Sequence, residues 1–136
     1  MTDLLLDTSV AVPLLLTSHV AHRVVSESLV DRSVALSGHA LHETYAVLTR
    51  LPGDARVAPE DAVRLLRERF EPAVVLDVRA VRSASTALAD SGVAGGATYD
   101  GLVALAARAA GLPLGTRDRR AQSTYQLLGV QVEMIG

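Results

Sequence analysis

The sequence predicts an α/β protein: a three-layer α/β/α fold with a mostly parallel central sheet flanked by helices. The first observation is that short apolar runs alternate with longer segments of helical periodicity along the 136 residues. The second is that 49% of the residues are hydrophobic but only 3% are aromatic, so Leu, Val and Ala must build the core. The third is the length, which suits a single domain spanning residues 1–136.

The expected strands are short apolar runs bounded by polar or turn residues. Residues 2–6 show the pattern most simply, because the run is too short for a helix and lies between Thr and Asp. The same pattern predicts four further strands along the chain. The five strands expected are residues 2–6, 33–37, 73–78, 114–116 and 130–135.

The expected helices have recognisable start and stop signals. Thr8 or Ser9 offers an N-cap for the first helix, and Pro59 begins another with two acids in its first turn. Gly111 ends a long alanine-rich helix, and the glycine-rich run 91–96 before that helix is expected to be a flexible loop. The seven helices expected are residues 9–16, 19–30, 39–51, 59–70, 79–89, 97–110 and 119–128.

The composition excludes several classes of protein. All 13 basic residues are arginine, which removes the lysine that a P-loop, a Schiff-base enzyme or a receiver domain requires. The chain has no cysteine, so it has neither disulfides nor thiol chemistry, and we expect a cytoplasmic protein. No window approaches 18 uncharged apolar residues, so no membrane association is expected, and residues 1–7 lack the features of a signal peptide.

Four acidic residues lie either at the end of an expected strand or within an expected helix. Asp7 and Asp118 follow two expected strands, Asp100 opens the alanine-rich helix, and Glu43 lies in the helix expected at 39–51. Each acid taken alone also has an ordinary structural role, as a helix cap, a first-turn acid or a solvated side chain. Open α/β sheets, however, build their sites at strand ends along one edge, where Asp7 and Asp118 would meet. Asp100 stands at a helix start, which normally lies at the opposite edge, and it joins them only if the glycine-rich loop before it crosses over.

An acid cluster of this kind calls for a cation. Two carboxylates about 5 Å apart repel by roughly 3 kcal/mol at an effective dielectric constant of about 20. Four of them together therefore require either protonation or a bound ion. Mg²⁺ or Mn²⁺ held by carboxylates and waters is the usual arrangement, which points to metal-dependent hydrolysis of a phosphodiester.

The segments around these acids resemble those of the PIN-domain family, and within it the VapC toxins. The similar segments are residues 4–10 (LLLDTSV), 42–51 (HETYAVLTRL), 98–100 (TYD) with the alanine-rich helix that follows, and 116–118 (TRD). The resemblance covers essentially the whole chain, in order and spacing. One departure is Ala121, where many members have an aromatic residue after the fourth acid.

The resemblance implies an endoribonuclease that cleaves single-stranded regions of RNA and is the toxin of a type II toxin–antitoxin system. Asp7, Glu43, Asp100 and Asp118 would be catalytic and bind Mg²⁺ or Mn²⁺, which would activate the attacking water. A cognate antitoxin protein would occupy the acidic groove. Residues expected to orient the carboxylates or waters are Thr8, Ser9 and Thr116.

Other features leave alternatives open. Arg117, Arg119 and Arg120 either contact the RNA backbone or cover helix surface. The N-terminal half has surplus apolar residues, which fit either a homodimer interface or simple core packing. Two histidine pairs have a spacing that zinc uses but lack further ligands. The competing functions are a housekeeping PIN-fold nuclease for RNA or DNA processing and a non-catalytic binding module with an acidic groove.

Overall fold

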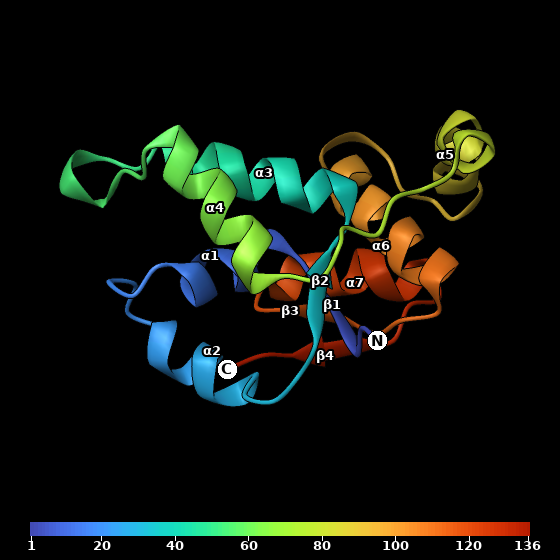
Figure 1. The fold of residues 1–136 in the computed structure, drawn as a ribbon. Coiled ribbons are helices and arrows are strands. Elements are labelled where there is room, and N and C mark those ends of the chain that lie inside the picture. Colours follow the sequence, from blue (N-terminus) through green and yellow to red (C-terminus); the bar gives the residue numbers. More distant parts are fainter.

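The computed structural model describes residues 1–136 and has a four-stranded sheet at its centre (Figure 1). The strands are β1 (Leu4–Leu6), β2 (Val34–Leu36), β3 (Leu114–Thr116) and β4 (Val132–Met134), in the order β2-β1-β3-β4. All three pairings are parallel. Every residue of β1, β2 and β3 is buried, and successive strand residues point to opposite faces, so both faces are covered. The predicted α/β class is confirmed.

Seven helices surround this sheet. Helix α3 packs against α1 and α4 and also touches α6, while α6 packs against α7. Figure 1 shows α5 at the periphery of the molecule, beside α6. None of the helices is long and apolar enough to cross a membrane. Their bounds are α1 (Thr8–Leu15), α2 (His22–Ser28), α3 (Gly38–Thr49), α4 (Pro59–Arg69), α5 (Val78–Asp90), α6 (Thr98–Ala110) and α7 (Arg119–Leu127), with short 3₁₀ turns at Gly53–Ala55 and Gly95–Ala97.

The strand expected at residues 73–78 is wrong. The segment runs beside β2, where Glu71 N donates to Val34 O and Val74 N to Leu36 O, but only one isolated bridge, Ser37 to Val74, forms. The two donors are three residues apart and their acceptors only two, so the segment carries one extra residue and loses its register with β2. Helix α5 then begins at Val78.

Several expected element ends also move. Helix α2 begins at His22 instead of residue 19, because His19 Nδ1 accepts a hydrogen bond from Ala21 N and holds a turn there. The backbone of Asp31 is left-handed, with φ of 61°, so no helix continues past it. The N-cap of α1 is Asp7, not Thr8 or Ser9. The last strand spans three residues instead of the six predicted.

The core brings the start of α6 close to its neighbours. Residues 103–107 of α6 are all buried, and most of them are alanine or valine. A Cβ atom added at Gly101 would come within 2.5 Å of Leu88 Cδ2 and 3.1 Å of Val93 Cγ1. Helix α5 and the loop after it therefore press directly on the first turn of α6, which fixes the position of Asp100.

Candidate active site

Asp7 lies at the end of β1 and is only 6% exposed. Its Oδ1 accepts hydrogen bonds from Ser9 N at 3.0 Å and Ser9 Oγ at 2.5 Å. Its Oδ2 accepts from Thr116 Oγ1 at 2.5 Å and Tyr125 OH at 2.7 Å. Burial raises the pKa of Asp7 above its ordinary value, although these four hydrogen bonds oppose the shift. The carboxylate is thus held in one orientation by donors that fill its usual acceptor sites.

Asp118 lies beside Asp7 because β1 and β3 are neighbours in the sheet. It caps α7, and its Oδ1 accepts from Arg120 N at 2.9 Å and more weakly from Ala121 N at 3.4 Å. Its own N–H donates to Thr116 Oγ1 at 3.0 Å. Thr116 therefore links the two acids, since the same hydroxyl donates to Asp7. Asp118 is a cap and a member of the acid cluster at once.

Asp100 is the residue whose surroundings show that the four acids converge. It lies in the first turn of α6 and is half-buried. Partial burial raises its pKa, and the negative charges of Asp7, Asp118 and Glu43 raise it further. A nearby His39 opposes this effect. The structure thus brings all four acids predicted from the sequence within electrostatic reach of one another.

Glu43, on α3, is the most exposed of the four acids. Its Oε2 lies 3.4 Å from His39 Nε2, one helical turn earlier. That nitrogen is buried and makes no hydrogen bond, so the contact lacks hydrogen-bond geometry, and it is an ion pair only when the imidazole is protonated. The His39 ring also stacks on Tyr99, with centroids 5.3 Å apart and planes within 7°.

Sequence reasoning missed two residues of this site. Tyr125 is fully buried, and burial together with Asp7 raises its pKa far above the ordinary value, so it remains a donor. The second is His39, whereas His42, which adjoins Glu43 in the sequence, lines the groove between α3 and α4. One signal was available for His39: it stands four residues before Glu43, on the same face of a helix.

The other predicted site residues take different positions. Ser9 and Thr116 both donate to Asp7, but Thr8 does not; its Oγ1 accepts from the buried Thr44 Oγ1 at 3.4 Å. Arg117 N donates to Ser9 Oγ at 2.8 Å, and Arg117 Nε is buried without a hydrogen-bond partner. Of the three arginines predicted to contact RNA, Arg119 and Arg120 are exposed, at the start of α7.

The donor set fits a hard divalent cation, because it consists of carboxylate oxygens with a surplus of negative charge. After burial, which is the largest cause, the charges of Asp7, Asp118 and Glu43 raise the pKa of Asp100, in keeping with that surplus. No group of three or more His, Asp or Glu side chains is arranged to hold a metal ion as it stands. Asp7 would have to exchange one of its hydrogen bonds to coordinate an ion.

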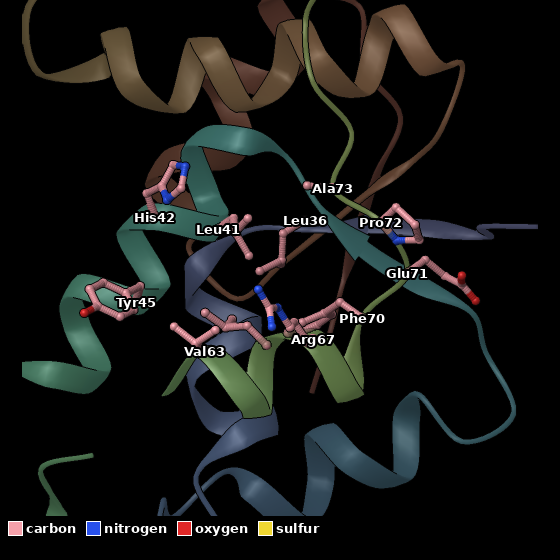
Figure 2. Close-up of a pocket in the computed structure, with 11 residues that line it drawn as sticks. Leu36, Leu41, His42, Tyr45, Val63, Arg67, Phe70, Glu71, Pro72 and Ala73 are labelled. Atoms are coloured by element: carbon pink, nitrogen blue, oxygen red, sulfur yellow. The ribbon is translucent and has the colours of Figure 1, made fainter. Parts of the chain in front are cut away.

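The largest hollow of the molecule is elsewhere. It is a groove of about 460 Å³ between α3 and α4, and none of the four acids lines it. Figure 2 shows Leu41 of α3 and Val63 and Arg67 of α4 on its two sides, with Phe70 beside Arg67 at the end of α4. His42 also lines this groove. Its apolar lining contrasts with the acid cluster, so the two are separate surfaces.

Comparison with known proteins places this chain in a family. Residues 4–127 match the model of the PIN domain, so the chain belongs to the PIN-domain family. It is 52% identical over 129 residues to ribonuclease VapC27 of Mycobacterium tuberculosis, an alignment that covers 95% of this chain and 94% of the relative.

Solved structures share the fold at lower identity. VapBC2 from Rickettsia felis, solved bound to a DNA fragment from its promoter, matches with a TM-score of 0.69 and 16% identity, covering 99% of this chain and 100% of that one. VapC20 of M. tuberculosis, a toxin that cleaves the sarcin–ricin loop, matches with a TM-score of 0.67 and 19% identity, covering 89% and 94%. These likenesses show the fold of the chain.

Proposed function

We propose that this protein is a metal-dependent endoribonuclease that cleaves single-stranded regions of RNA and acts as the toxin of a toxin–antitoxin pair. The observation that carries the proposal is the convergence of four acids: the charges of Asp7, Glu43 and Asp118 all act on the half-buried Asp100. Supporting it, the chain is 52% identical to a protein named as a ribonuclease over nearly its whole length.

The four acids would hold Mg²⁺ or Mn²⁺ between them. When bound, such an ion supplies a water of lowered pKa and stabilises charge on the phosphodiester. The chain's own residues do the positioning: Ser9, Thr116 and Tyr125 fix both oxygens of Asp7. Capping of α7 fixes Asp118 in the same way. Such outer partners orient the groups that hold an ion.

The RNA backbone would be held beside the acids by arginine. Arg119 and Arg120 are exposed next to Asp118, and a guanidinium group binds phosphate with two parallel hydrogen bonds. Arg117 is tied down by its backbone bond to Ser9 and is half-buried. We therefore assign phosphate contact to Arg119 and Arg120 first.

An antitoxin would silence the enzyme by placing a basic side chain among the four carboxylates, where opposite charge is concentrated. The homodimer is also a proposal. Among the apolar residues of the N-terminal half, Leu14 and Val25 are core residues, whereas Val20 and Val24 are exposed. Helix α5 and the segment before it expose three further valines, Val75, Val78 and Val81, so both surfaces offer apolar side chains for a contact between copies.

The function is tested by incubating the purified protein with total RNA, with Mg²⁺ and then with a chelator in excess. Fragments that form only with Mg²⁺ and carry 5′-phosphate ends are the expected result. Intact RNA under both conditions, with calorimetry showing no Mn²⁺ binding, would contradict the proposal. Mn²⁺ binding without any cleavage would favour a non-catalytic module.

A further inference from the structure

Tyr99 is exposed in a chain that has few aromatic rings to spare. Only four of the 136 residues are aromatic. Tyr125 is fully buried, and Tyr45 and Phe70 line the groove between α3 and α4, whereas Tyr99 is 59% exposed. Leaving a large apolar ring in water forgoes roughly 1.5–3 kcal/mol of burial free energy, so a packing role does not account for its position.

The Tyr99 ring is nevertheless held in place. It is the second residue of α6, and it stacks on the ring of His39, the second residue of α3, with planes within 7° of parallel. A ring has two faces, and the imidazole covers one. The parallel stack and the high exposure together leave the second face available to a planar ligand.

This stack belongs to the acid cluster in space. Tyr99 directly precedes Asp100, and His39 Nε2 lies 3.4 Å from Glu43 Oε2. His39 is also close enough to Asp100 to act on its charge. The two rings therefore border the acids contributed by α3 and α6.

Unpaired RNA bases are planar ligands that stack on Tyr and His rings, and each such stack contributes roughly 1–3 kcal/mol to binding. We propose that the Tyr99 ring, backed by His39, is a stacking platform for an unpaired base next to the phosphodiester held at the four acids. The inference rests on the proposed ribonuclease function. It names the part of the substrate that the site grips besides the phosphate: a base exposed in a single-stranded region.

The test uses a cleavage-inactive parent, Asp100→Asn, so that binding is measured without turnover. Asp100 makes no side-chain hydrogen bond within the chain, so the isosteric amide leaves the fold in place. The probe is a short single-stranded RNA in which 2-aminopurine replaces one base at a time. Stacking on a tyrosine ring quenches 2-aminopurine emission, which reports the contact independently of activity.

The parent should quench the probe at one or two adjacent positions. Adding Tyr99→Ala should abolish that quenching and weaken binding by roughly tenfold, whereas Tyr99→Phe should retain both because it keeps the ring. The matched control is Leu127→Ala, which removes an apolar side chain of similar exposure, 61%, at the far end of α7. Thermal unfolding of each variant checks that the fold persists.

Two results would overturn the platform while leaving the nuclease intact: unchanged quenching and affinity in Tyr99→Ala, or loss of both in Tyr99→Phe, which would implicate the hydroxyl. Failure of the proposed function looks different. In that case the parent binds no single-stranded RNA at any probe position and the wild type cleaves none, and the platform falls with it.

Discussion

Tyr125 donates a hydrogen bond to Asp7 Oδ2 at 2.7 Å, although 118 residues separate the two in sequence. The bond connects α7, which follows β3, to the carboxyl end of the neighbouring strand β1. Both partners are buried, Tyr125 completely. A carboxylate that is buried and still ionised needs such donors, so the bond stabilises the fold and the site together.

Replacing Tyr125 with Phe is expected to lower the free energy of unfolding by about 1.5–3 kcal/mol, the usual contribution of a buried hydrogen bond to a charged group. Urea unfolding at neutral pH measures it. Tyr45→Phe is the matched control, because its hydroxyl makes no hydrogen bond within the chain; its effect should stay within about 0.5 kcal/mol. Equal losses in the two variants would show that the Tyr125–Asp7 bond adds nothing.

Asp100→Asn should make the metal-free protein more stable at neutral pH. Because the folded pKa of Asp100 is raised above the unfolded value of 3.8, its stabilising contribution is present below pH 3.8 and is lost as the pH rises through the folded pKa. An asparagine cannot ionise and escapes that loss. Urea unfolding in the presence of a chelator, measured from below pH 3.8 to neutral pH, should show that the variant's excess free energy of unfolding over the wild type grows with pH.

Added Mg²⁺ should stabilise the wild type more than Asp100→Asn, since ligand bound only to the folded state raises stability. An advantage of the variant that is independent of pH, or no advantage at all, would argue that the four acids do not repel one another in the folded protein.

Arg119→Gln is expected to weaken RNA binding and to flatten its salt dependence. Each phosphate contact removed should lower the slope of log K against log salt by about 0.7 for a single strand. Fluorescence titrations of a short RNA at several salt concentrations measure both quantities. Arg82→Gln makes the same charge change on α5, and an equal loss of slope there would mean that only net charge matters.

The proximity of Asp7 and Asp118 could be predicted because it depends on local signals, whereas the place of Asp100 depended on whether the glycine-rich loop before it crosses over. Strand ends, helix starts and the parallel order of strands are written in short segments of sequence. The partners of these acids could not be predicted in the same way. Which side chain of α7 returns to Asp7 depends on how that helix is rotated on the sheet, and nothing near Tyr125 encodes it.

Tertiary packing also explains why the site histidine and the missing strand at residues 73–78 could not be predicted. His39 and His42 are three residues apart, and only the packing of α3 decides that His39 faces Glu43 and Tyr99 while His42 lines the groove. The apolar run 73–78 has strand composition, but its register with β2 is broken and it forms only one isolated bridge, at Val74. Tertiary contacts overrode the local pattern in both cases.

The central claim, that the four converging acids make an RNA-cleaving site, is tested most directly by a charge-matched pair of variants. Asp100→Asn removes one acid of the cluster, and Asp77→Asn removes an acid that caps α5, where asparagine caps equally well. Single-turnover cleavage of RNA in Mg²⁺ should fall by roughly 100-fold or more in the first and stay unchanged in the second. Wild-type cleavage by Asp100→Asn, or an equal fall in both, would contradict the account.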